Sequence, residues 1–418
     1  LAAKNDLRRG HVRLDGGVMG TKQRIVFWIW LMMVVAYLDR VNITLAGPVL
    51  SRALHLSPSQ FGFVLSSFTL GYALMQVPGG YLADRLGARP LLVAALAIWS
   101  AFTALTAAAW SFVSLAVIRV LFGFGEGVEN GAQFKLIGDH FDSRARSSAN
   151  ALFLTAIALG PAVAAPLSTW LIRQVGWRGL FLVFAGAGLV VALLMALFLP
   201  RPTDEVVHTE IADDTGVRAG WKAVIRRPVT WLAFFAYLFF NVAFWGFLGW
   251  MPTYLNTTRH IKLADLGYLA SVPYFCGFLG MVLIGQLGAR ALYRSRAALI
   301  GVSYLVSAGF LYTAYSANTV VACVAGLSLA GFFLYGGFGP FWAITLDNIP
   351  DDLRGAFTGF VNLGGQIGGF FAPIVVGEIV QQTKSFTGGF LFMIAALVLA
   401  SISLFLLQAT GRRQTALA

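Results

Sequence analysis

The segment Gly80-Tyr81-Leu82-Ala83-Asp84-Arg85-Leu86-Gly87-Ala88-Arg89 is a short charged break between two long apolar stretches. A related segment, Gly285-Gln286-Leu287-Gly288-Ala289-Arg290-Ala291-Leu292-Tyr293-Arg294, lies at the corresponding place in the second part of the chain. The first glycine and two arginines keep their register, whereas Asp84 has no counterpart. This repetition predicts two related halves, with any shared binding site near the membrane midplane between them.

The composition places both halves in a lipid bilayer. Of the 418 residues, 58% are hydrophobic and 11% are charged, which is too apolar for a soluble chain of this length. Apolar stretches of about 20 residues, the length that crosses the hydrocarbon layer, recur along almost the whole sequence. We therefore predict an all-α membrane protein with twelve transmembrane helices, at 25–47, 60–83, 90–109, 112–137, 147–171, 179–199, 229–255, 265–288, 297–315, 319–345, 355–380 and 387–409.

The one long polar break divides these spans six and six. It predicts an N-terminal tail at 1–24, a six-helix half at 25–199, a cytoplasmic linker at 200–228, a second six-helix half at 229–409 and a tail at 410–418. The net charge of +12 collects in alternate loops: with the N-terminus inside, 22 Lys and Arg residues lie inside and 6 outside. This asymmetry predicts that both termini are cytoplasmic and argues against nucleic acid as a partner.

Four charged side chains interrupt the apolar spans, two in the first span and two in the fourth: Asp39, Arg40, Arg119 and Glu126. Ionisable groups at bilayer depth cost at least a few kcal/mol each, so they face one another, an aqueous cavity or a charged substrate. A helical rise of about 1.5 Å per residue puts all four in one slab of the membrane. Arg119 and Glu126 are two turns apart and share a face. We expect Glu129 to join the inner-side charges near Lys135 instead.

The residue types in this group point to anion transport. Arg40 and Arg119 suit substrate anchors, because a guanidinium stays protonated and pairs bidentately with a carboxylate. Asp39 and Glu126 are the switchable members, since all five histidines lie in tails or loops. The expected cycle is that their protonation releases both arginines to bind an anion, so that anion and protons cross together. The alternative is a pair of internal salt bridges that only fix helix packing.

The second half has no comparable charge in its spans, so its share of the site is expected to be polar and aromatic. With Tyr37 and Tyr72 of the first half, the further substrate-binding candidates are Asn241, Trp342, Thr345, Asn362 and Gln366. Asn362 and Gln366 share one helical face, and unpaired amides are costly in lipid. The chain shows no metal-ligand cluster, cofactor motif or catalytic nucleophile–base cluster, so we expect neither metal nor cofactor nor enzymatic activity.

The loop residues Gly80, Asp84, Arg85, Gly87 and Arg89 resemble the signature between the second and third spans of the major facilitator superfamily. The resemblance covers essentially the full chain and implies the fold of that family. In the family, the Asp and Arg of this loop brace the two halves on the cytoplasmic side in one conformation. The resemblance therefore implies a cytoplasmic gate at Asp84, Arg85 and Arg89.

Three motifs together resemble the anion:cation symporter branch of that superfamily: Tyr37-Leu38-Asp39-Arg40-Val41-Asn42, Arg119 followed by Glu126, and Trp250-Met251-Pro252-Thr253-Tyr254-Leu255. The branch includes bacterial carriers of sugar acids and the animal vesicular glutamate and sialic acid transporters. The resemblance implies that Arg40 and Arg119 bind the substrate and that Asp39 and Glu126 couple protons.

We therefore expect a proton-coupled symporter that imports an organic anion, a sugar acid of the galactonate, glucarate or hexuronate type, by alternating access. Its expected setting is a bacterial inner membrane, as a monomer in the lipid bilayer. An efflux antiporter is the first alternative, since Gly160-Pro161 is similar to a motif of drug/proton antiporters, although Ala164 and Ala165 replace the glycines that usually follow. A receptor that senses an anion without moving it is the second.

Overall fold

The computed structural model is all-helical over the residues that it describes, which are 20–141, 152, 154–200, 223–347 and 353–417, without the side chains of 345–347, 355 and 411–417. The N-terminal group of helices comprises α1 (Thr21–Ala53), α2 (Pro58–Leu86), α3 (Ala88–Thr106), α4 (Phe112–Gly127), α5 (Glu129–His140) and α7 (Ala156–Phe198). The C-terminal group comprises α9 (Pro228–Thr257), α10 (Leu263–Ala289), η1 (Tyr293–Ser295), α11 (Arg296–Ser316), α12 (Val320–Gly336), α13 (Phe338–Asp347), α14 (Arg354–Thr383) and α15 (Thr387–Leu417). The predicted linker falls mostly within 201–222, outside these ranges.

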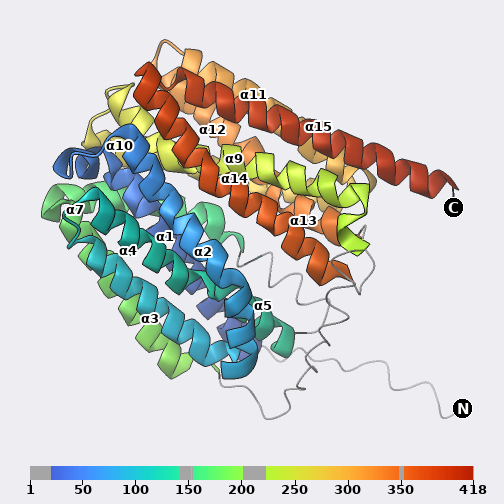
Figure 1. Cartoon of the computed structure of the whole chain (residues 1–418), viewed down its shortest axis with the longest axis horizontal. Coiled ribbons are helices and arrows are strands. Elements are labelled where there is room, and N and C mark those ends of the chain that lie inside the picture. Colours follow the sequence, from blue (N-terminus) through green and yellow to red (C-terminus); the bar gives the residue numbers. More distant parts are fainter. Residues whose placement is uncertain (1–19, 142–151, 153, 201–222, 348–352, 418) are drawn as a thin grey trace, which may run out of the picture.

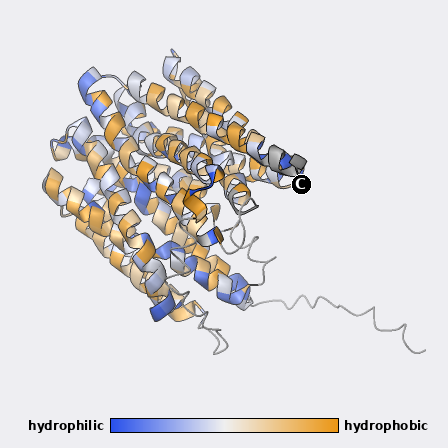
Figure 2. Cartoon of the chain, turned by 45° about the vertical axis from the view of Figure 1, so that its right-hand side comes forward, coloured by the Kyte–Doolittle hydropathy of each residue, from blue (hydrophilic) through white to orange (hydrophobic). Residues whose placement is uncertain are grey.

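Within the described residues, 10 helices are long and apolar enough to cross a membrane. Two predicted spans share α7, whose 43 residues are divided by a kink at Gly176 (φ 74°, ψ 173°). The predicted span 112–137 is divided between α4 and α5, which meet at Val128. Figure 2 shows hydrophobic residues over most of the helix lengths, with hydrophilic segments at helix ends and inside the bundle.

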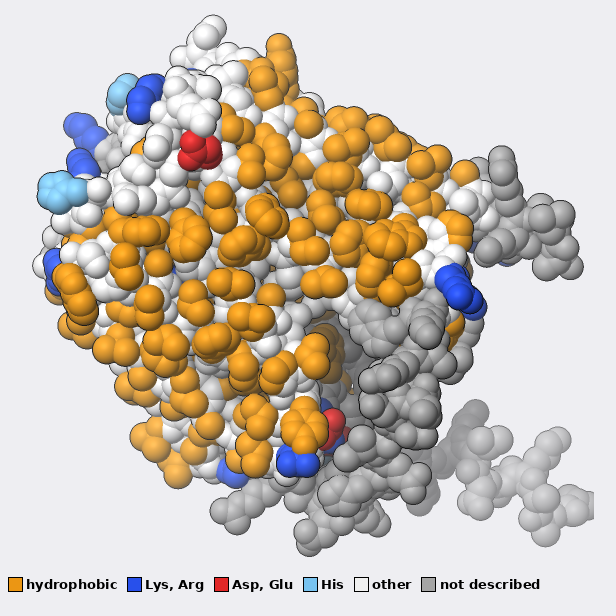
Figure 3. Space-filling view, viewed as in Figure 1, with side chains coloured by type: hydrophobic (Ala, Val, Ile, Leu, Met, Phe, Trp, Pro, Cys, Tyr) orange, Lys and Arg blue, Asp and Glu red, His pale blue; other side chains and the backbone are white. Residues whose placement is uncertain are grey.

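The outer surface is apolar, as a lipid-facing surface requires. Large hydrophobic side chains such as Leu193 and Leu197, which are 60% and 64% exposed, point away from the bundle. The face seen in Figure 3 is covered mainly by hydrophobic side chains, and Lys, Arg, Asp, Glu and His lie near its margins. Exposed apolar surface of this extent indicates contact with lipid.

The two groups meet through three helix pairs, α2 with α14, α7 with α10 and α1 with α9. At one end of the bundle, called here the Ser59 end, Ser59 Oγ donates to Glu378 Oε2 at 2.5 Å and the Ser59 N–H donates to Gln381 Oε1 at 3.2 Å. Figure 1 shows the groups close together at this end and diverging toward the opposite end, which carries Asp84. The surface in Figure 3 is hollowed where they diverge.

Glycines set how closely α2 approaches α4. A Cβ on Gly71 would overlap the carbonyl oxygen of Val120, and a Cβ on Gly123 would overlap that of Phe68. Small residues let membrane helices approach backbone to backbone in this way. The contact fixes the face of α2 that carries Phe68 and Tyr72 against the charged residues of α1 and α4.

Candidate functional site

Arg40 lies at the centre of the N-terminal group and is held by two carboxylates. Its Nε donates to Glu126 Oε1 at 2.5 Å, and its Nη2 donates to Glu129 Oε1 at 2.9 Å. The Arg40 side chain is 5% exposed and both glutamates are 0% exposed. A guanidinium presents several donors in a fixed fork, so one arginine can satisfy two acids from neighbouring turns.

The expectation that Glu129 joins the inner-side charges is wrong. Lys135 pairs with Asp84 instead, at 2.9 Å between Nζ and Oδ1. The spacing explains the error: three residues along a helix turn the side chain back by only about 60°, which leaves Glu129 on nearly the same face as Glu126. The long side chain of Arg40 spans this offset.

Aromatic rings surround the Arg40 guanidinium. Its Cζ lies 4.5 Å from the Tyr37 ring centre, 5.0 Å from that of Tyr72 and 5.3 Å from that of Phe68. The Tyr72 hydroxyl accepts a hydrogen bond from Asn130 Nδ2 at 2.5 Å. These rings exclude water from the ion pairs and contribute cation–π attraction to the arginine.

Arg119 has a different environment. It is 3% exposed, and its Cζ lies 4.5 Å from the Phe122 ring centre and 5.3 Å from that of Phe68. No carboxylate of the described residues comes within 4.0 Å of its nitrogens, and its buried Nε has no hydrogen-bond partner among them. Phe68 thus lies beside both arginines: Arg40 is paired with two acids, whereas Arg119 has none within 4.0 Å among the described residues and interacts with Asp39 and Glu126 at longer range.

Asp39 faces away from Arg40, toward α3. Adjacent residues on a helix differ by about 100°, and Asp39 lies beside Trp99 and Thr103 while its Oδ1 accepts from Asn42 Nδ2 at 3.3 Å. The other oxygen, Oδ2, is buried without a partner among the described residues. Asp39 and Arg40 therefore do not line the same wall of the site.

The C-terminal group contributes aromatic rings opposite Arg40. Tyr237 stacks on Phe341 with ring centres 5.0 Å apart and meets the edge of Trp342 at 5.1 Å. Asn241 uses its Nδ2 within its own helix, donating to the Tyr237 carbonyl at 2.8 Å. Across the interface between the two groups, the ring centres of Trp245 and Phe68 are 6.0 Å apart. The Tyr37 and Tyr237 phenols are close enough to interact electrostatically, so the cluster reaches the boundary between the groups.

Of the remaining predicted residues of this group, Asn362 and Gln366 lie on α14 and Thr345 lies on α13. Asn362 Nδ2 donates to Gln76 Oε1 of α2 at 2.7 Å, a hydrogen bond between the two groups. Gln366, one turn further, is half-buried. The side chain of Thr345 lies outside the described residues. Asn362 therefore joins the halves, in addition to any contact that it makes with a substrate.

The loop residues of the predicted gate are bound within the N-terminal group. Asp84 pairs with Lys135, and Arg85 lies over the Tyr81 ring at 4.5 Å. Arg89 donates to two carbonyls in the last turn of α7, at 2.8 Å and 2.5 Å. All of these described contacts lie on one side of the interface, at the end where the groups diverge.

Sequence reasoning missed three contributors to the cluster. Phe68 and Tyr237 are aromatic residues in apolar spans, which carry no signal that separates them from ordinary packing residues. Glu129 did carry one, because a carboxylate three residues from Glu126 lies on nearly the same face of a continuous helix.

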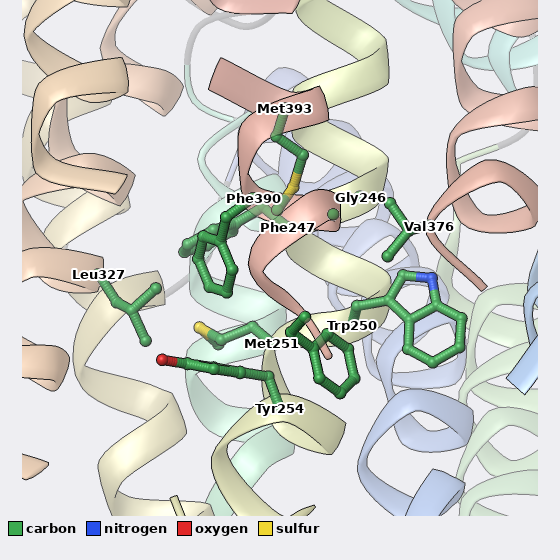
Figure 4. Close-up of a pocket in the computed structure, with 11 residues that line it drawn as sticks. Gly246, Phe247, Trp250, Met251, Tyr254, Leu327, Val376, Phe390 and Met393 are labelled. Carbon is green, nitrogen blue, oxygen red and sulfur yellow. The ribbon is translucent and has the colours of Figure 1, made fainter. Parts of the chain in front are cut away.

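A pocket elsewhere in the C-terminal group is lined by apolar side chains. Figure 4 shows Phe247, Trp250, Met251 and Tyr254 of α9 facing Met393 and other residues of α12, α14 and α15. No charged residue lines it. The pocket is therefore unsuited to an anion, and the buried arginines remain the candidate site.

The comparisons with known proteins agree with this architecture. The family model of the Major Facilitator Superfamily matches residues 29–373. The Hexuronate transporter of Bacillus subtilis is 28% identical over 394 residues, covering 91% of this chain and 93% of the relative. The probable sulfoacetate transporter SauU of Cupriavidus necator is 30% identical over 391 residues, covering 88% and 89%.

A solved bacterial homolog to the human lysosomal transporter Spinster, in an inward-facing and unoccupied conformation, has a TM-score of 0.78 with this chain. It is 18% identical, and the match covers 94% of this chain and 98% of that structure. This likeness concerns the fold. Together with the family match over most of the sequence, it identifies the chain as a member of the major facilitator superfamily, an integral multi-pass membrane transport protein and not an enzyme.

Proposed function

We propose that this protein is a proton-coupled symporter that imports an organic anion, a sugar acid of the hexuronate type, by alternating access. The hexuronate transporter among its relatives supports the substrate class. The sulfoacetate relative supports the wider requirement for an acidic group. Arg40 and Arg119 are the proposed anchors for the substrate carboxylate, and Asp39 and Glu126 the proposed proton carriers.

The charge balance of the buried cluster carries this proposal. It contains three carboxylates, Asp39, Glu126 and Glu129, and two guanidiniums, Arg40 and Arg119, all of them buried. Fully ionised, the group has a formal charge of −1, and an entering carboxylate would raise this to −2. Because an uncompensated buried charge costs several kcal/mol, the anion needs at least one accompanying cation. A proton on one carboxylate supplies it.

The two arginines have complementary proposed roles. Arg119, without an acid partner among the described residues, is the group that receives the substrate carboxylate first. Arg40 becomes available once protonation of its acids weakens the ion pairs. The sugar ring would then lie among aromatic rings and amides, which cover apolar faces and bind hydroxyls; the proposed contacts are Tyr37, Tyr72, Asn241, Trp342, Thr345, Asn362 and Gln366.

The same proposal includes the topology. Counting α7 as two spans, α4 with α5 as one and α12 with α13 as one gives twelve, with 25–199 and 229–409 as the two halves. The proposed orientation puts the Asp84 end and both termini in the cytoplasm of a bacterial cell, in the inner membrane, and the functional unit is a monomer. The described state is then closed toward the outside by the Ser59–Glu378 contact, and Asp84, Arg85 and Arg89 form the gate when the inside closes.

The test is uptake of labelled glucuronate into proteoliposomes with an imposed proton gradient. We expect accumulation when the outside is acidic, no requirement for sodium, and loss of gradient-driven accumulation in Glu126→Gln. Accumulation of wild-type size in Glu126→Gln would remove the coupling role. Binding without accumulation would favour a receptor, and movement against the imposed proton gradient would favour an efflux antiporter.

A further inference from the structure

Glu129 has a polar neighbour that the transport cycle proposed above does not use. Gln133 follows it by one helical turn on α5 and is 0% exposed. Both amide atoms of Gln133, Nε2 and Oε1, are buried without a hydrogen-bond partner among the described residues, and so is Glu129 Oε2. A buried amide with neither end bonded costs a few kcal/mol. The unpartnered atoms of Gln133 and Glu129 therefore suggest that these side chains bond in another state of the protein.

The spacing brings these unpartnered atoms within reach of each other. Residues four apart on a helix have Cβ atoms about 5–6 Å apart, a distance that a glutamate and a glutamine bridge by side-chain rotation. A protonated Glu129 can donate its O–H to Gln133 Oε1. In the described arrangement Glu129 is held by Arg40 and makes no hydrogen bond with Gln133. The Gln133 amide is therefore placed to serve the protonated form of this carboxyl group.

The other groups around Glu129 favour a change of protonation. From α1, Arg40 holds its Oε1 at 2.9 Å, and the Tyr37 phenol is near. From α2, the Tyr72 phenol is near, and from α4, Glu126 shares the same arginine. The one titratable residue of α3, Arg89, is bound at the end of α7. One cation thus serves two acids, so the site has an excess of one negative charge.

We propose that Glu129 is a proton-binding residue of the transport cycle, with Gln133 as the hydrogen-bond acceptor that stabilises its protonated form. The proposal rests on the proton-coupled function proposed above. The proton binds to a Glu129 carboxylate oxygen, the ion pair with Arg40 weakens, and the O–H turns to Gln133 Oε1. The freed Arg40 donors then face the substrate carboxylate. When the anion leaves, the proton is lost to water and Arg40 returns to Glu129.

The number of protons carried per substrate tests this proposal. Reversal potentials of glucuronate flux in proteoliposomes, measured at several proton gradients, give the ratio directly. We expect Glu129→Gln to transport with one proton fewer per anion than the wild type, and Glu129→Asp, which keeps the carboxyl group, to retain the wild-type ratio. Asp265→Asn, at the start of α10 and remote from Arg40 in the fold, serves as the control variant and should leave the ratio unchanged.

Gln133→Met replaces the amide by an apolar side chain of similar size, and it tests whether Gln133 accepts a hydrogen bond from protonated Glu129. We expect the pH at half-maximal glucuronate binding to move toward lower values, by up to about one unit, because the protonated carboxyl loses one hydrogen bond. Gln133→Asn, which keeps a neutral amide acceptor on a shorter side chain, should move it less.

Each outcome separates the two proposals. A wild type that couples no protons would overturn the proposed function itself. A wild type that couples protons, with the same ratio in Glu129→Gln, would overturn the inference about Glu129 alone. An unshifted binding profile in folded Gln133→Met would overturn the role of Gln133 as acceptor.

Discussion

Replacing Arg119 by Gln should weaken substrate binding more than it destabilises the substrate-free protein. Arg119 is buried, and no carboxylate of the described residues pairs with it. Removing its charge therefore strands no acid within 4.0 Å. The melting temperature of the substrate-free protein in detergent should fall less than in Arg40→Gln, because the change breaks no ion pair within 4.0 Å, although it takes the formal charge of the buried cluster from −1 to −2.

The size of the binding loss follows from the contact that the substrate would make. A hydrogen bond to a charged group contributes about 1.5–3 kcal/mol. At 1.36 kcal/mol per factor of ten, the dissociation constant for glucuronate should rise by about 10- to 150-fold. Arg119→Lys should lose less, because it keeps the charge but not the bidentate geometry.

Isothermal titration of purified protein with glucuronate, at the pH where the wild type binds best, measures this constant. The control is thermal unfolding of the same preparations without ligand. An Arg119→Gln variant that is as stable as the wild type and binds glucuronate with the same constant would refute the assignment of Arg119 as an anchor. A variant destabilised by several kcal/mol would show that the side chain has a partner that the cluster geometry does not reveal.

Three further predictions concern stability and the contact between the halves. Arg40→Gln should lower the free energy of unfolding by about 3–5 kcal/mol, because it strands two buried acids, and adding Glu129→Gln should restore part of this loss in thermal unfolding. Glu378→Ala removes the acceptor of the Ser59–Glu378 hydrogen bond, so pulsed EPR distances between labels on the two groups at the Ser59 end should gain a longer component. An unchanged distance distribution would show that this hydrogen bond does not hold the two groups together there. Gly71→Val should destabilise by about 1–3 kcal/mol because its side chain meets the backbone of α4, whereas Gly80→Ala, with nothing within 4 Å, should melt like the wild type.

The sequence predicts the helices well because lipid imposes a simple rule. The long described helices each overlap a predicted apolar span, since backbone groups in hydrocarbon must bond within their own segment. The short η1 lies between two predicted spans. The interruptions were not predictable from hydropathy. α4 ends and α5 begins at Val128, in a segment rich in glycine that has no proline, and the kink at Gly176 depends on a positive φ that only the structure reveals.

The candidate site was predictable in its charges and less so in its pairing. Arg40 and Glu126 stand out because charges in apolar spans are rare, and the structure joins them directly. Which acid pairs with which arginine depends on side-chain length and helix rotation. Only the structure shows that Arg40 pairs with Glu129 as well as Glu126, and that no described carboxylate lies within 4.0 Å of Arg119. Asn362 likewise has a partner in the opposite half that no spacing within one helix could indicate.

The hydrogen bond between Asn362 and Gln76 has a consequence for speed. It is a junction between the halves formed by two neutral amides, worth about 0.5–1.5 kcal/mol. This is no more than about three times the thermal energy of about 0.6 kcal/mol, and breaking the bond leaves no bare charge in hydrocarbon. A lysine–glutamate pair at the same depth would cost more free energy to break, and it would therefore slow the rocking of the two halves. The ion pairs of the described residues lie inside the N-terminal group, and the groups are joined by hydrogen bonds of Asn362 and of Ser59. The protein thus separates the forces that select its cargo from those that resist its motion.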